Sequence, residues 1–145
     1  MASPTREEIM EALFTLLQTT SGIVTFGRRL KLWNNVPAEQ QPALFLVEHS
    51  EARLNSLRGT PGRLQLLAQI FLYVKTTDME VIGGTELNNL IDAIEATLAP
   101  ADPKVNVQTL GGLVDRCWIN GTIIKDPGDI DGQALAIIPI NILVP

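Results

Sequence analysis

Residues 134–145 read Ala134-Leu-Ala-Ile-Ile-Pro-Ile-Asn-Ile-Leu-Val-Pro145, and this apolar stretch decides the fold. Successive side chains of a β-strand point to opposite faces of a sheet, so a strand that is apolar at both alternating positions has two apolar faces. The two faces consist of Ala136, Ile138, Ile140 and Ile142, and of Leu135, Ile137 and Leu143. Pro139 removes one donor from the strand ladder, which favours a sheet edge or a bulge. We therefore predict an edge strand with a neighbour on its far side.

This strand is expected to be the second of a pair that begins at residue 108. The first long strand should place one set of apolar side chains on a common face, namely Leu113, Cys117, Ile119 and Ile123. Within it, Gly111-Gly112 predicts a bulge or a close approach of backbone. The acidic sequence Asp126-Pro-Gly-Asp-Ile-Asp-Gly132 should form the turn between the two strands.

Further strands are expected upstream. Residues 63–75 show the cleanest alternation in the chain, which predicts a half-buried antiparallel strand. Its apolar face consists of Leu64, Leu66, Ala68, Ile70, Leu72 and Val74. Residues 42–49 form a short, strongly apolar strand and residues 22–32 a further strand region, whereas residues 34–42 are expected to be a loop.

Two helices are predicted. The first should run from about residue 4 to residue 19, because Ser3-Pro4 can cap and begin a helix and because Thr5 and Glu8 have the spacing of a capping box. The second should run over residues 85–98, with Thr85 as its N-cap after Gly83-Gly84. The sequence thus predicts an α+β fold, with a mixed or mainly antiparallel sheet flanked by two helices, in a single domain over residues 1–145.

Composition excludes several classes of function. The formal net charge of −5 argues against a general nucleic-acid binder, which needs a basic surface to displace counterions from phosphates. No apolar run is long enough to predict a membrane helix, and no secretory signal is visible, so we expect a chain that is made and used in a cytoplasm. The single Cys117 cannot form an internal disulfide, and without a cluster of His or Cys it predicts no zinc site.

Candidate catalytic residues are few. His49, beside Glu48 and Glu51, could act as an acid or base, but the sequence favours a partly exposed residue at the end of a strand. Cys117 could be a nucleophile, but its apolar neighbours favour a buried structural thiol. The acidic turn lacks the ligand spacing of a calcium loop. We therefore expect no enzyme, no metal and no cofactor.

Candidate assembly residues are easier to find. A ring needs two different patches on each subunit, because its contacts run head to tail. We predict that the basic cluster Arg28, Arg29 and Lys31 meets acidic residues such as Asp126, Asp129 and Asp131 of a neighbour. The last strand should contribute an apolar surface made of Ile138, Ile140, Ile142 and Val144.

Short phrases in a fixed order extend this interpretation. They are Arg6-Glu7-Glu8-Ile9, Pro42-Ala-Leu-Phe-Leu-Val-Glu-His-Ser-Glu51, the long strand of residues 64–74, Leu87-Asn-Asn-Leu-Ile-Asp-Ala-Ile-Glu95, and the ending from Leu110-Gly-Gly-Leu-Val to Ile140-Asn-Ile-Leu-Val-Pro145. Together they cover nearly the whole chain. In this order the chain resembles the tail terminator, or tail completion, proteins of tailed bacteriophages.

The resemblance implies an α+β subunit that forms a ring, with a hexamer as the expected order, on the last ring of the tail tube. Such a ring stops tube growth and presents a surface to the neck. The implied partners are further copies of the chain, the tail tube protein and a neck or head-completion protein, without a membrane and without sequence-specific nucleic acid, although DNA passes through the channel. The implied location is the virion, after assembly in the cytoplasm of the bacterial host.

Two other interpretations remain open. A head-tail adaptor or joining protein of the neck would also be small, acidic and ring-forming. A small cytosolic α+β enzyme or ligand-binding domain would instead use His49 and the loop beside it as its site, and would be a monomer or dimer.

Overall fold

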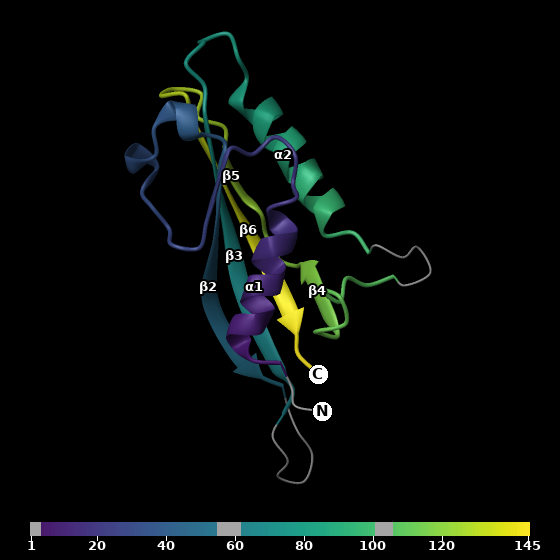
Figure 1. Ribbon diagram of the computed structural model, residues 1–145. Coiled ribbons are helices and arrows are strands. Elements are labelled where there is room, and N and C mark those ends of the chain that lie inside the picture. The colour runs from purple at the N-terminus through teal and green to yellow at the C-terminus, as the bar shows by residue number, and fades with distance from the viewer. Residues whose placement is uncertain (1–3, 55–61, 101–105) are drawn as a thin grey trace.

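One mixed sheet and two α-helices make up the part of the chain that the structure describes (Figure 1). The computed structural model describes residues 4–54, 62–100 and 106–145. The strands are β1 (Thr25–Gly27), β2 (Ala43–Arg53), β3 (Leu64–Lys75), β4 (Arg116–Ile119), β5 (Ile124–Asp126) and β6 (Gln133–Leu143), and the helices are α1 (Arg6–Leu17) and α2 (Gly83–Thr97). The strand order is β1-β2-β3-β6-β4, and β5 also pairs with β6. Only β1 and β2 are parallel, so the predicted α+β fold with a mixed sheet and two helices is confirmed.

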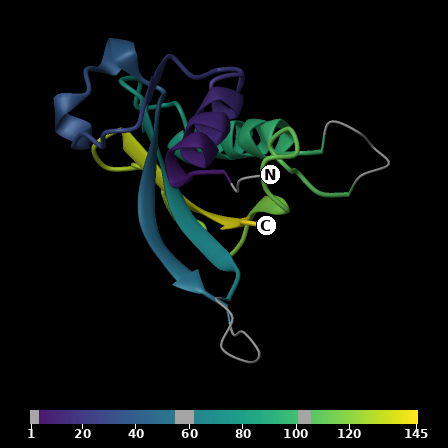
Figure 2. The same cartoon turned by 60° about the horizontal axis from the view of Figure 1, so that its bottom comes forward.

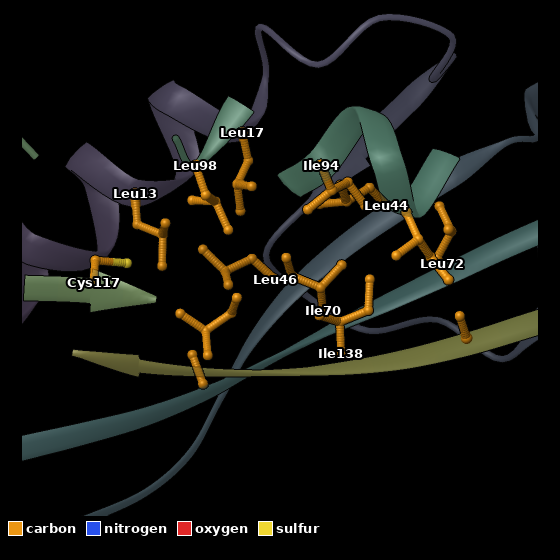
Figure 3. Close-up of a cluster of buried hydrophobic side chains, with 14 of the residues drawn as sticks. Leu13, Leu17, Leu44, Leu46, Ile70, Leu72, Ile94, Leu98, Cys117 and Ile138 are labelled. Atoms are coloured by element: carbon orange, nitrogen blue, oxygen red, sulfur yellow. The ribbon is translucent and has the colours of Figure 1, made fainter. Parts of the chain in front are cut away.

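The core lies between the helices and one face of the sheet. Figure 2 shows α1 and α2 on the same side of the strands. The alternation predicted for β3 is confirmed, since Ile70 and Leu72 are fully buried beside Leu44, Leu46 and Ile138 (Figure 3). The helices contribute Ile9, Met10, Leu13 and Leu17 from α1, and Leu87, Leu90, Ile91 and Ile94 from α2.

The prediction that the last strand lies at a sheet edge is wrong. β6 lies inside the sheet, with β3 on one side and both β4 and β5 on the other. β4 pairs with residues 140–143 and β5 with residues 135–137, so Pro139 lies opposite the interval between them. In an antiparallel strand, the N–H and C=O of a residue point to the same side. The Pro139 carbonyl accepts a hydrogen bond from the Asn120 N–H (3.2 Å), so this side of Pro139 faces the interval between β4 and β5. The Pro139 nitrogen, which has no hydrogen to donate, faces the same interval, and no hydrogen bond of the strand ladder is lost.

The same proline explains why the predicted long first strand of the pair is two short ones. Residues 120–123 leave the ladder opposite Pro139. Gly121 has a φ of 113°, and a Cβ there would lie 3.3 Å from the Pro139 ring. The chain upstream also differs from the prediction: Leu110, Gly111 and Gly112 all have positive φ and form a tight turn instead of a bulge.

Both helices begin near their predicted starts, with different caps. The capping box is confirmed, since the Glu8 N–H donates to Thr5 Oγ1 (3.1 Å). Thr5 is thus the N-cap of α1, Pro4 precedes the helix, and Ser3 lies outside the described residues. α2 begins two residues early, so Thr85 is not its N-cap. A Cβ on Gly83 would lie 2.1 Å from the Pro127 carbonyl oxygen, so this glycine lets α2 pack against the acidic turn.

Three segments before β3 also differ from expectation. The strand region predicted over residues 22–32 is only β1. The predicted loop contains two short 3-10 helices, Trp33–Asn35 and Ala38–Gln40. β2 extends past residue 49 to Arg53, with a change of register between Glu48 and Ser50.

We expect Ile138→Ala to lower the free energy of unfolding by about 2–5 kcal/mol, because it removes buried methylene groups and leaves a cavity under the helices. Ile137→Ala is the matched control, since this neighbour faces away from the helices and is only half-buried. It should cost clearly less. Urea denaturation of both variants at one low protein concentration makes the comparison, and equal losses would contradict the inward placement of Ile138.

Candidate assembly surfaces

The apolar surface predicted for the last strand does not exist as proposed. Ile138, Ile140, Ile142 and Val144 are all buried within the subunit, where they pack in the main core cluster. The physical reason is the central position of β6, which turns this set of side chains toward the helices. These four residues are therefore core residues, and the prediction that they contact a neighbour is wrong.

The other set of β6 side chains belongs to an uncovered surface. We define the open face as the side of the sheet that faces away from α1 and α2, excluding the end at which Phe45 and Tyr73 are covered. Its side chains on β3 from residue 65 to 71 and on β6 from 137 to 143 carry no charge. Most of them are half-buried by their own neighbours, and Ile124 at the margin is 58% exposed. The large side chains of the open face are Val47, Leu67, Phe71, Trp118, Ile137, Pro139 and Leu143.

One end of this sheet side is covered by a chain segment between β1 and β2. Val36 of that segment is buried against Phe45 and Tyr73 in a second, smaller core cluster. The Tyr73 hydroxyl donates to the Lys31 carbonyl oxygen (2.8 Å). Buried Gln41, which follows the segment, exchanges amide hydrogen bonds with Gln133 at the start of β6 (3.2 and 3.0 Å). The segment is therefore fixed to the sheet at several points.

The predicted basic cluster divides into an internal part and an exposed part. Arg28 is bound within the subunit, where its guanidinium pairs with both carboxylate oxygens of Glu7 on α1. Arg29 and Lys31 are exposed. They alternate with apolar residues that are also exposed, including Leu32 (64%) and Trp33 (46%). We call residues 29–33 the basic arm.

The predicted acidic residues lie together with a second loop that sequence reasoning missed. The turn of residues 126–132 lies beside residues 76–82: the Thr76 N–H donates to the Gly132 carbonyl (2.7 Å), and Lys75 Nζ donates to the Asp131 carbonyl (3.0 Å). We call these two loops the acidic end. Asp126, Asp129 and Asp131 are all exposed there.

Two apolar side chains of the acidic end protrude into solvent. Met79 is 98% exposed, and Ile130 is fully exposed. Each lies between two acidic residues, in Asp78-Met-Glu80 and Asp129-Ile-Asp131. Both residues lie in turns, where the alternation that would turn one side chain of a strand inward is absent. That acid-apolar-acid pattern is the sequence signal by which these residues could have been found.

The two candidate catalytic residues are not brought together: His49 lines a small hollow with Glu48 and Glu51, and Cys117 lies outside it. His49 is exposed at the register change in β2, and Cys117 is buried under α1. Burial raises the pKa of the Cys117 thiol to about 12. Residues 4–54, 62–100 and 106–145 contain no group of three or more His, Cys, Asp or Glu side chains that could hold a metal ion. Over the same residues, no helix is long and apolar enough to cross a membrane.

Comparison with known proteins gave no match to any protein-family model and no match to a curated protein. The family resemblance therefore rests on the order of elements and on the short sequence phrases.

Cys117 is expected to be inert in the folded protein. At about pH 8.5 an exposed cysteine is half ionised, whereas a buried thiol with a raised pKa stays protonated. A thiol-specific reagent such as Ellman's should therefore label Cys117 only after denaturation. Rapid labelling of the native protein would instead show a reactive thiol and would support the enzyme interpretation.

Removing the Arg28 charge should raise the pKa of the Glu7 carboxyl. The hydrogen bond from Arg28 holds the pKa of the Glu7 carboxyl below its ordinary value. The ordinary pKa of a glutamate is about 4.3, and at a pH above it this exposed pair stabilises the fold. That contribution is lost as the pH falls through the lowered pKa of Glu7. Arg28→Gln should raise the pKa of Glu7, as measured by an NMR titration of its carboxyl carbon. An unchanged titration would show that Arg28 is available to a partner.

Proposed function

We propose that this chain is the subunit of a ring that caps the end of a phage tail tube. The order of its elements and its short sequence phrases resemble the tail terminator proteins. The α+β architecture, with two helices and a mixed sheet, agrees with the architecture that this resemblance implies.

The open face is the observation that carries the proposal. Exposed apolar surface without charge is rare on a monomeric protein, and a large patch of it marks an interaction site. Here the half-buried Phe71 and Ile137 lie directly opposite each other on β3 and β6. A subunit whose sheet is covered by helices on one side and by a neighbouring copy on the other accounts for this surface.

A ring of this kind stops growth by ending a repeated contact. Tube rings stack because each ring offers the next one the same surface. A cap binds the last ring and presents a different surface, to which the neck protein binds. The net charge of −5 disfavours tight binding to phosphates, which suits a channel that lets DNA pass.

The mass of the protein in solution tests the ring directly. Light scattering should give a multiple of 15.8 kDa, with a hexamer as the expected order, and negative-stain images should show an annulus. Ile137→Glu should reduce the assembly to monomers, because an unpaired carboxylate would be buried at the contact. Asn89→Glu is the matched control, since Asn89 is exposed on α2, on the other side of the sheet, and it should leave the ring intact.

Mixing with cognate tail tubes then tests the cap. The ring should bind one end of each tube and stop its elongation. Binding to the portal side without binding to tubes would favour the adaptor instead. A wild-type protein that stays monomeric at every concentration, with or without tubes, would contradict the ring.

A further inference from the structure

The basic arm and the acidic end have complementary patterns of charge and exposure. The arm contains the base-apolar-base sequence Arg29-Leu-Lys31, followed by exposed Leu32 and Trp33. The acidic end contains two acid-apolar-acid sequences, centred on Met79 and Ile130. Each surface thus offers protruding apolar side chains flanked by charge of one sign, and the signs are opposite.

Neither surface is neutralised by a side chain among the described residues of its own subunit. In the part of the chain that the structure describes, the ion pairs join Arg6 to Glu51, Arg28 to Glu7 and Arg63 to Asp115. The side chains of the basic arm and of the acidic end take no part in them. Lys75 turns its ammonium group to a backbone carbonyl of the acidic turn, so it only partly offsets the acidic charge.

We infer that the basic arm of one copy docks on the acidic end of the next copy. Two identical arms, or two identical acidic ends, would place like charges against each other, which disfavours a symmetric dimer through either surface. Docking of one arm on one acidic end leaves an arm and an acidic end free in the pair, so further copies can add until a ring closes. A two-fold pair, in which each arm docks on the other copy's acidic end, would leave neither free, and a wild type that stops at a dimer overturns the inference. This inference rests on the proposed ring and names a second contact between its subunits, in addition to the open face.

Charge and apolar burial have separate roles in this contact. Exposed ion pairs contribute little to affinity one by one and are screened by salt, so the charges mainly set the orientation and the rate of association. Affinity comes from Leu32, Trp33, Met79 and Ile130, which lose solvent exposure on docking. Ring formation should accordingly become slower at high salt.

Charge reversal with mixing tests the contact. One variant carries Arg29→Glu and Lys31→Glu, and the other carries Glu80→Lys and Asp129→Lys. In the described residues the Glu80 and Asp129 side chains make no hydrogen bond, whereas Asp78 and Asp131 each accept one from a backbone N–H, so the chosen pair spares the loops. Circular dichroism checks that each variant is folded, and light scattering measures assembly.

Each variant alone should need at least about tenfold more protein to assemble than the wild type, since like charges then face each other at every contact. An equal mixture of the two should form rings again, because a reversed arm fits a reversed end and a native arm fits a native end. Alternating copies satisfy every contact in a ring of even order. Asp92→Lys with Glu95→Lys is the control for the acidic-end variant, because it makes the same change of charge at exposed positions of α2.

The outcomes separate this inference from the proposed function. A monomeric wild type contradicts the ring itself. A wild-type ring whose assembly is unaffected by either reversal, or whose variants stay apart when mixed, overturns the inference and leaves the ring standing on another surface. If a reversed variant does not fold, Leu32→Ser and Ile130→Ser take its place: both should weaken assembly, and wild-type assembly of both would also overturn the contact.

Discussion

The burial of alternate side chains along β3 and β6 beneath two helices is the interaction on which the rest of the structure depends. The two strands pair over residues 65–75 and 133–143, with buried partners such as Ile70 and Ile138 directly opposite each other. Each fully buried aliphatic side chain of this kind stabilises the fold by about 1.5–3 kcal/mol. β2 attaches to one side of the pair, and β4 and β5 attach to the other.

The central position of β6 changes the meaning of its composition. A strand with two apolar faces at a sheet edge would offer both its side chains and its backbone to a neighbour. In the middle of the sheet its backbone is largely paired, one face belongs to the core, and only the other face remains available. Pro139 fits there because β4 and β5 leave a gap opposite it, so the proline marks an interruption in the neighbouring strands.

Apolar exposure is concentrated on three surfaces of different character. The open face is broad and mainly apolar, with Arg116 over Trp118 at its β4 margin. The basic arm alternates bases with apolar residues, and the acidic end alternates acids with apolar residues. A subunit with several unlike surfaces suits an assembly in which each copy contacts neighbours in more than one way. Within the described residues, Arg28 is the one member of the predicted basic cluster that has a carboxylate partner, on α1 of its own chain.

Local patterns in the sequence determined the helices, the long strands, the capping box at Thr5 and the acidic turn, because each depends on residues a few positions apart. Three other features depend on which strands become neighbours. They are the side of β6 that faces the core, the pairing of Arg28 within its own subunit, and the contact between the loops that contain Met79 and Ile130. Strand order follows from packing the whole sheet against the helices, where contacts join residues far apart in the chain. Alternation shows that a strand has two apolar faces, and only the tertiary structure decides which of them is buried.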